Sequence, residues 1–501
     1  MAPGVSVSGT PVVDGGQLVS TSPATGEEVG RFPVADAEAV AAAVARARAA
    51  ADWWRDLGFD ARRRRLYAWR ALITARLDEL TGIMHREGGK PIGDATAETA
   101  AAVDHIHWAA RHAKRVLRMR RVGGALLQSE YTAHVEYQPY GVVGVIGPWN
   151  YPIFTPVGSI GYALAAGNAV VFKPSEYTPA VGQFLVDTFA EVVPEHPVLQ
   201  VVHGLGDTGA ALVTSGVDKI AFTGSTRTGK RVMAAAAETL TPVLLECGGK
   251  DAMIVDSDAD LDAAAEATVW GGLFNAGQTC IGIERVYAVE SVYDAFLAKV
   301  VAKAGRLTVG AEPGADIGPM TMPGQIDVVR RHIAAALADG GEAVLGGPEA
   351  VRPPFVHPTI LVNVPETSEA VREETFGPTL TIAKVRDVDE AVERVNAAHY
   401  GLAGAVFGKA RAMATARRLR SGMTSINSTL SFAGIPSLPF GGVGDSGFGR
   451  IHGADGLREF ARPKAIAKRW MPSLVKVLTF EKGPRDLKLT RLALRILHGR
   501  K

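Results

Sequence analysis

The sequence predicts an α/β fold built on parallel sheets, and three observations support this prediction. Helical periodicity dominates residues 36–118, whereas from residue 134 onward short apolar runs end in turns rich in Gly, Pro and Asn. A helical segment follows most of these runs, which is typical of βαβ units and a parallel sheet. The length of 501 residues exceeds what one hydrophobic core usually supports, so we expect two or three domains.

The N-terminal region is expected to be helical. Apolar residues recur at helical spacing over 36–52 and 60–88, and a third helix is expected over 94–118. Asp36 and Asp60 precede the first two periodic stretches and are predicted to be their N-caps.

Four consecutive arginines at 62–65 could indicate nucleic-acid binding. They fall within the second predicted helix, beside apolar Leu66 and Trp69. A solvated helix face explains them better, so we expect no nucleic-acid partner.

The composition is that of an ordinary globular protein, with 47% hydrophobic and 21% charged residues. Two cysteines cannot form a disulfide framework, and the first thirty residues contain no Lys or Arg. The longest apolar stretch, 159–172, is interrupted by Gly167 and Asn168, and no stretch reaches the length of a membrane span. These features predict a cytoplasmic protein.

Positive charge is concentrated at the C-terminus. Residues 461–501 contain 12 Lys or Arg and two Asp or Glu, although the formal net charge of the whole chain is only +2. Gly483 and Pro484 introduce a predicted helix with two stripes. The apolar stripe holds Leu489, Leu492, Ala493 and Ile496, and the basic stripe holds Lys488, Arg491 and Arg495. Such a helix lies on an anionic membrane, or it docks on its own protein or a second subunit; both interpretations stay open.

Glycine-rich turns follow two of the predicted strands. Gly204, Gly206 and Gly209 have the GxGxxG spacing, which alone is a weak signal. At the second turn Gly224 permits close backbone approach, and the Ser225 hydroxyl with the following helix N-terminus could hold a phosphate. Ser225 is equally well explained as an N-cap.

A third strand end carries Lys173 and, three residues later, Glu176. A lysine there can bind a ribose hydroxyl, and a carboxylate can accept hydrogen bonds from the 2′ and 3′ hydroxyls. Because that carboxylate would repel a 2′-phosphate, the pattern favours NAD over NADP. The alternative is a surface ion pair beside a turn.

Two residues are candidates for covalent chemistry. Glu246 ends an apolar strand before two glycines, where partial desolvation raises a carboxyl pKa toward the range of a general base. Cys280 follows the loop sequence NAGQT and would need a base to become a nucleophilic thiolate. Taken singly, Glu246 reads as a solvated strand end and Cys280 as an inert buried thiol.

Seven motifs together resemble the NAD(P)-dependent aldehyde dehydrogenase superfamily over roughly residues 20–470. In chain order they are PWNYP, KPSE, FTGST, LECGGK, NAGQTC, EETFGP and PFGGVGDSGFGRIHG. The resemblance implies a Rossmann-like NAD-binding domain, an α/β catalytic domain and a small β oligomerisation element. The implied ranges are 1–121 with 139–247, then 248–445, then 122–138 with 446–472, followed by a basic tail at 473–501.

The resemblance also implies roles for single residues. Cys280 matches the nucleophile, Glu246 the general base and Asn150 the side-chain donor of the oxyanion hole, with the Cys280 N–H as second donor. No metal is implied. The matching cofactor contacts are Trp149, Lys173, Glu176, Gly206, Phe222, Gly224, Ser225, Glu374 and Phe376. Residues expected to border the substrate are Tyr151, Phe154, Phe274 and Phe432, with Trp270 nearby, although these aromatics could be plain core packing.

The implied reaction is oxidation of an aldehyde to a carboxylic acid through a cysteine hemithioacetal and thioester, with NAD, or else NADP, as cofactor. The aromatic residues slightly favour an apolar aldehyde. The family usually forms dimers or tetramers, and residues 460–470 are expected to pair with 126–138. Alternatives are a CoA-acylating relative, a thiol esterase and a non-catalytic NAD-binding protein on the same fold.

Overall fold

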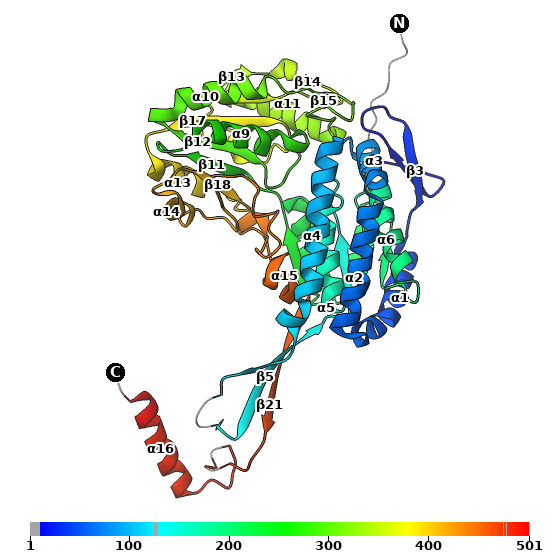
Figure 1. Ribbon diagram of the computed structural model, residues 1–501, viewed down its shortest axis with the longest axis vertical. Coiled ribbons are helices and arrows are strands. Elements are labelled where there is room, and N and C mark those ends of the chain that lie inside the picture. Colours follow the sequence, from blue (N-terminus) through cyan, green and yellow to red (C-terminus); the bar gives the residue numbers. More distant parts are fainter. Residues whose placement is uncertain (1–10, 125–127, 474, 477, 500–501) are drawn as a thin grey trace.

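The computed structural model describes residues 11–124, 128–473, 475–476 and 478–499 (Figure 1). The first ten residues of the predicted cofactor domain, part of the predicted pairing segment at 125–127, and residues 474, 477 and 500–501 of the tail lie outside the described residues. Among the described residues, no helix combines the length and the apolar character that crossing a bilayer requires.

A small antiparallel sheet and four helices form the N-terminal region. The strands are β1 (Val12–Asp14), β2 (Gln17–Thr21) and β3 (Glu28–Pro33), and the helices are α1 (Ala37–Asp56), α2 (Gly58–Ala75), α3 (Leu77–Gly88) and α4 (Ile92–Leu117). Asp36 caps α1 as predicted, because its carboxylate accepts a hydrogen bond from the Ala39 N–H at 2.8 Å.

Three predictions for this region are wrong. The stretch expected as one helix over 60–88 is two helices that meet at Arg76, and Asp60 lies inside the first turn of α2 instead of capping it. Its carboxylate pairs with Lys114 at 2.7 Å. Arg62 is not on a solvated face: it is 3% exposed and donates to the backbone carbonyls of Trp54 and Arg55, which end α1.

The first large sheet has six strands in the order β20-β10-β9-β6-β7-β8, and only β20 is antiparallel. These strands are β6 (Val142–Ile146), β7 (Ala169–Lys173), β8 (Leu199–Val201), β9 (Lys219–Thr223), β10 (Val243–Glu246) and β20 (Gly447–Phe448). The connecting helices are α5 (Phe154–Ala166), α6 (Pro179–Val192), α7 (Gly206–Thr214) and α8 (Thr226–Ala237). Helices α5 and α2 pack on each other beside this sheet, as do α6 and α3.

The second large sheet has seven strands in the order β13-β16-β17-β12-β11-β18-β19. They are β11 (Asp251–Val255), β12 (Ile283–Val289), β13 (Glu342–Leu345), β16 (Thr359–Val362), β17 (Thr379–Val385), β18 (Gly404–Phe407) and β19 (Ser425–Ile426). Its helices are α9 (Leu261–Leu273), α10 (Glu290–Ala304), α11 (Pro323–Ala338), α12 (Glu369–Arg372), α13 (Val388–Asn396) and α14 (Ala412–Ala416). A small hairpin, β14 (Val351–Arg352) with β15 (Phe355–Val356), and three 3₁₀ turns, Phe274–Gly277, Pro348–Ala350 and Gly444–Ser446, complete this half. The predicted α/β fold with parallel sheets is therefore confirmed.

A narrow arm extends from this body (Figure 1). It consists of β4 (Arg120–Val122), β5 (Tyr131–Pro139), β21 (Ala461–Arg469) and the chain beyond, which ends in α16 (Pro484–His498). β21 pairs with β5 along its whole length, from Ala461 opposite Pro139 to Arg469 opposite Tyr131, so the predicted pairing is confirmed over the described residues. Within 446–472 the arm begins only at β21, because β20 joins the first sheet and α15 (Gly453–Glu459) packs on α4 and α5.

Candidate active site

A single groove of about 1580 Å³ runs past the carboxyl ends of strands in the first sheet and reaches the start of the second. Ligands in parallel sheets collect at this edge, because the loops after the strands diverge there. All nine residues predicted to contact the cofactor line the groove, together with the three predicted catalytic residues. These twelve are Trp149, Asn150, Lys173, Glu176, Gly206, Phe222, Gly224, Ser225, Glu246, Cys280, Glu374 and Phe376.

The loop that presents Cys280 has an unusual backbone. Asn275, Ala276 and Gly277 all have positive φ, at 54°, 57° and 70°. Two consecutive non-glycine residues in this region store strain that the surroundings must hold. Gly277 permits the tight packing of this loop, because a Cβ there would lie 2.2 Å from the carbonyl of Gly377. The loop is therefore pinned close to the segment that carries Phe376.

Asn150 is held in place by contacts to its side chain and to its backbone. Its side-chain amide donates to the Gln278 carbonyl at 2.9 Å, and its own carbonyl accepts from the Asn275 side chain at 3.1 Å. Because an amide nitrogen carries two hydrogens, one of them stays available for a substrate oxygen. Asn150 thus joins the end of β6 to the loop that carries Cys280.

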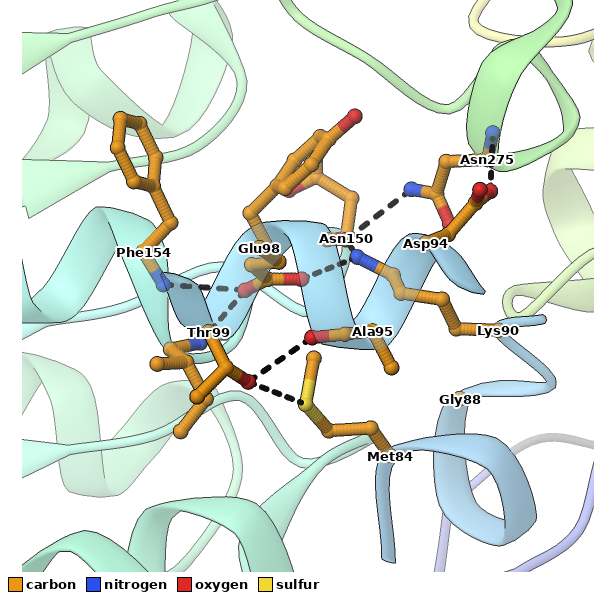
Figure 2. A network of polar contacts seen from close by, with 12 residues as sticks. Met84, Gly88, Lys90, Asp94, Ala95, Glu98, Thr99, Asn150, Phe154 and Asn275 are labelled. Carbon is orange, nitrogen blue, oxygen red and sulfur yellow. Dashed lines mark hydrogen bonds and ion pairs between the residues drawn. The ribbon is translucent and has the colours of Figure 1, made fainter. Parts of the chain in front are cut away.

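A buried ion pair supports Asn150 from below (Figure 2). The Lys90 ammonium donates to the Asn150 carbonyl at 2.7 Å and pairs with the Glu98 carboxylate on α4. The other Glu98 oxygen accepts from the N–H groups of Ile153 and Phe154 at 2.9 and 3.0 Å, at the start of α5. We call this network the Lys90–Glu98 support. This support was not predicted from the sequence, since Glu98 is one of several polar residues in an alanine-rich helical pattern.

Glu246 ends β10 and is 3% exposed. Neither carboxylate oxygen has a hydrogen-bond partner among the residues that the structure describes. Burial raises its pKa well above 4.5, while the charge of Arg450 lowers it and that of Glu459 raises it. Gly441 leaves room beside the carboxylate, because a Cβ there would lie 2.7 Å from one of its oxygens. A buried, unpartnered carboxyl of raised pKa suits a general base.

The two cysteines differ in setting. Cys280 is partly exposed to the groove, and burial of the sulfur raises its pKa, followed by the charges of Glu374 and Asp251. The Ile281 N–H lowers it. Cys247 is buried, burial raises its pKa to about 12, and its sulfur lies against Gly229 of α8. Cys280 is the thiol that a molecule in the groove reaches most readily.

The outer part of the groove has the donors that a dinucleotide needs. Lys173 and Glu176 lie side by side at the end of β7, with their charged atoms 3.5 Å apart. Burial lowers the pKa of Lys173, and its ammonium also donates to the Pro174 carbonyl at 3.1 Å. Lys173 and Glu176 both line the groove, where ribose hydroxyls could replace their present hydrogen-bond partners.

Helices α7 and α8 both begin at the groove, and their free N–H groups favour an anion there. Ser225 is the N-cap of α8, with its hydroxyl accepting from the Thr228 N–H at 3.3 Å, so it also fulfils the structural role. Arg227 and Arg231 on α8 line the same groove. Neither arginine was predicted as a site residue, because an exposed arginine on a helix carries no signal of its own. These residues fit a pyrophosphate.

Glu374 and Phe376 lie at the inner part of the groove. The Glu374 carboxylate accepts from the Gly249 N–H at 3.0 Å, and burial, followed by the charge of Glu284, raises its pKa to about 8. Phe376 has φ of 51°, and its ring meets Trp149 edge-on with centroids 5.4 Å apart. Glu284 fixes this segment by accepting from the N–H groups of Thr375 and Phe376.

The four residues expected at the substrate do not line this groove. Tyr151 stacks on Phe274 with ring centroids 6.2 Å apart, and its hydroxyl bonds that of Thr279, the neighbour of Cys280, at 2.7 Å. Phe154 and Phe432 are buried, and each ring lies 6.4 Å from that of Phe440. Tyr151 and Phe274 therefore stay close to the cysteine loop, whereas Phe154 and Phe432 pack in the core.

The arrangement defines a class of nucleotide-binding α/β protein, with the groove at the strand ends. A family model described as the aldehyde dehydrogenase family matches residues 13–466. The chain therefore belongs to the aldehyde dehydrogenase family, in which NAD or NADP serves as cofactor.

Relatives within this family differ in the aldehyde that their names give. The 4,4′-diapolycopene aldehyde oxidase of Methylomonas sp is 38% identical over 450 residues, covering 89% of this chain and 84% of the relative. The glutarate-semialdehyde dehydrogenase of Pseudomonas putida is 36% identical over 460 residues, covering 90% and 95%. The crystal structure of an NAD-dependent aldehyde dehydrogenase from Sinorhizobium meliloti, 34% identical, superposes with a TM-score of 0.88 over 93% of this chain and 94% of that one.

Proposed function

We propose that the protein oxidises an apolar aldehyde to a carboxylic acid, with NAD as cofactor. One observation carries this proposal: the buried, unpartnered carboxylate of Glu246 lies on the same groove as Cys280 and Asn150. A carboxylate in that state is costly to bury, and a role in proton transfer explains its presence.

The first step takes place on Cys280. Its thiolate attacks the aldehyde carbon, so that a C–S bond forms and the carbonyl π electrons move to oxygen. The free hydrogen of the Asn150 amide and the Cys280 N–H then bind this oxyanion. The nicotinamide cofactor supplies the hydride acceptor. As the oxyanion collapses, the C–H bond breaks with its electron pair and a thioester remains on Cys280.

The second step releases the product. Glu246 takes a proton from a water molecule, whose oxygen attacks the thioester carbon. The C–S bond breaks, the thiolate re-forms and the carboxylic acid leaves. A CoA-acylating relative would transfer the acyl group to a thiol and would not need this base, so Glu246 favours hydrolysis.

Two features support the choice of cofactor and substrate. The Glu176 carboxylate beside Lys173 would repel a 2′-phosphate, which favours NAD, with NADP as the alternative. The rings of Tyr151 and Phe274 beside the cysteine loop favour an apolar aldehyde, as does the likeness to the diapolycopene aldehyde oxidase. The Lys90 ammonium, 4.1 Å from the Tyr151 ring, is already bound by Glu98 and so is not free for a substrate carboxylate.

We also propose that the chain forms a homodimer or homotetramer in the cytoplasm. In the arm sheet, β21 is a nine-residue edge strand whose outer side has no paired strand among the described residues. Exposed edges of this kind pair readily with another chain. The two cysteines are free, which suits a reducing compartment.

The test is NADH or NADPH formation across a panel of apolar, aromatic and carboxylate-bearing aldehydes. We expect the highest kcat/KM for an apolar aldehyde with NAD. Cys280→Ser should be inactive towards every aldehyde while retaining NAD binding, and Cys247→Ser is the matched control that should keep its activity. Cofactor-independent ester hydrolysis by the wild-type protein without any aldehyde oxidation would contradict the proposal.

A further inference from the structure

Helix α16 lies at the end of the arm (Figure 1), and none of its residues is buried. Six large apolar side chains on it are between 39% and 67% exposed: Leu487, Leu489, Leu492, Leu494, Ile496 and Leu497. A monomeric protein rarely exposes this many contiguous apolar side chains unless something covers them. The helix lies far from the two large sheets, so the body of its own chain does not cover it.

The side chains of α16 are sorted by polarity around the helix axis. At 3.6 residues per turn, Lys488, Arg491 and Arg495 fall within a sector of about 60°. The six apolar side chains span more than half of the circumference on the other side, where Thr490 is the one polar residue after the first turn; Arg485 and Asp486 of the first turn also fall in this sector. Asp486 is the only acidic residue of the helix, and its carboxylate is used at the N-terminus, where it accepts from the N–H groups of Gly483 and Lys476. A basic sector opposite a broad apolar sector is typical of helices that lie in a bilayer interface.

The segment before α16 has further apolar side chains. Trp470 is 59% exposed, and Leu478 and Phe480 are exposed still further, with Phe480 essentially free of protein contacts. Tryptophan and other amphipathic rings are enriched at the level of lipid headgroups. Two separate parts of the arm therefore present side chains of the type that enters a lipid interface.

The positive charge of the arm also favours a lipid surface as its partner. Residues 461–501 have 12 basic and two acidic residues, and Arg120 and Arg121 of β4 add positive charge to the arm. Since the whole chain has a net charge of only +2, the body is acidic. An anionic surface would attract the arm and repel the body, which orients the molecule with α16 against that surface.

We propose that α16 binds an anionic lipid bilayer, with its apolar sector in the headgroup boundary and Lys488, Arg491 and Arg495 at the phosphates. A second copy of this chain is the other candidate partner. A helix docked on a protein surface typically buries a stripe of roughly 100°. The apolar sector of α16 is about twice as wide, so protein docking would leave much of it in water. The width of the sector and the basic charge together favour the bilayer.

Such a contact would hold the groove near aldehydes that dissolve in the membrane. This consequence rests on the proposed oxidation of apolar aldehydes, whereas the bilayer contact itself does not. The two can therefore fail separately: vesicle binding is measured without substrate, and activity towards a small water-soluble aldehyde is measured without vesicles.

The experiment is flotation of the full-length protein with vesicles of phosphatidylcholine alone or with 30% phosphatidylglycerol added. We expect the wild-type protein to float with the anionic vesicles and to bind neutral ones at least tenfold more weakly. Leu492→Glu/Ile496→Glu should lose flotation. The matched control Leu240→Glu/Met413→Glu changes two exposed apolar residues of the body, 90% and 59% exposed, and should float like the wild type.

A second variant tests the charge. Each basic residue near an anionic surface strengthens binding by about fivefold, so Lys488→Gln/Arg491→Gln/Arg495→Gln should weaken binding by about a hundredfold. All variants should keep wild-type activity with a small soluble aldehyde, which shows that they are folded. Flotation of Leu492→Glu/Ile496→Glu at the wild-type level would overturn the proposal. Failure of the wild-type protein to bind anionic vesicles would also overturn it. If the oligomer of the Leu492→Glu/Ile496→Glu variant then dissociates in sedimentation velocity, α16 is a contact between subunits.

Discussion

Glu98 and Glu246 are both buried carboxylates near the groove, and they differ in every contact. Glu98 has the Lys90 ammonium and two backbone N–H groups as partners, whereas Glu246 has none among the described residues. Burying an unpartnered carboxyl costs free energy, which the protein avoids at Glu98. The comparison separates two tasks: the partnered carboxylate fixes the chain around Asn150, and the unpartnered one is free to take up a proton.

The largest expected effect comes from removing the unpartnered carboxylate. We expect Glu246→Gln to lower steady-state turnover by about 10²–10⁴-fold, since a general base typically contributes this much. Because we assign Glu246 to hydrolysis of the thioester and not to its formation, rapid mixing should show a burst of about one NADH per active site, followed by a very slow rate. Mass spectrometry should detect the thioester on Cys280. Loss of the burst together with turnover would show that Glu246 acts before the thioester forms.

The second prediction concerns Asn150, which the Lys90–Glu98 support holds in position. Asn150→Ala should lower kcat by about 10²–10³-fold, the usual effect of losing one oxyanion donor. NAD affinity, measured by protein fluorescence, should stay near the wild-type value, because the cofactor contacts are untouched. Near-normal turnover in this variant would remove Asn150 from the mechanism.

The third prediction breaks the Lys90–Glu98 support itself. Lys90→Met leaves the Glu98 charge buried without its cation, which typically costs about 3–5 kcal/mol in the free energy of unfolding. Urea denaturation measures this loss. The matched control is Lys303→Met, which removes an exposed ion pair with Glu266 and should change the free energy of unfolding by less than about 1 kcal/mol. Equal losses in the two variants would mean that the buried pair has no special role.

Much of the fold was predictable from the sequence, for a local reason. Parallel strands buried on both faces are continuous apolar runs, and the turns after them need Gly, Pro or Asn. The strands that bear Lys173 and Glu246 can therefore be recognised in the amino-acid sequence. Because parallel strands end at one edge of a sheet, residues after different strands come together. All twelve predicted catalytic and cofactor residues accordingly lie on one groove, although their roles stay predictions.

What the sequence could not reveal depends on tertiary contacts. Arg62 looks like its three arginine neighbours, but it alone of them is buried beneath the end of α1. Glu98 is distinguished by the Lys90 ammonium and by the start of α5, more than fifty residues away. Asp60 resembles an N-cap, but α1 and α2 meet at Leu57, which moves the helix start to Gly58.

The smallest expected effect concerns Glu87 on α3, a third buried carboxyl that can be compared with Glu98 and Glu246. It accepts from the Ser20 hydroxyl at 2.6 Å and from the N–H groups of Ala180 and Val181 at 2.9 and 3.0 Å, but in the part of the chain that the structure describes it has no ion-pair partner. Burial raises its pKa from 4.5 to about 7. The folded protein therefore holds this proton at pH values where the unfolded chain has released it. The stability contributed by Glu87 is present below pH 4.5 and is lost as the pH rises to 7.

We expect Glu87→Gln to remove this contribution, because glutamine does not titrate; its single amide oxygen still accepts from two of the three donors, whereas its NH2 group cannot accept from the third. Between pH 5 and 7 the free energy of unfolding should fall less steeply in the variant than in the wild type, by at most about 1.4 kcal/mol per pH unit for one proton. Urea denaturation at several pH values measures the slope. Identical slopes would mean that the three hydrogen bonds keep the pKa of Glu87 near its ordinary value. Hydrogen bonds alone would then suffice to hold a buried carboxylate charged, and the contrast between Glu98 and Glu246 would rest on the absence of those bonds at Glu246 and not on the absence of a cation.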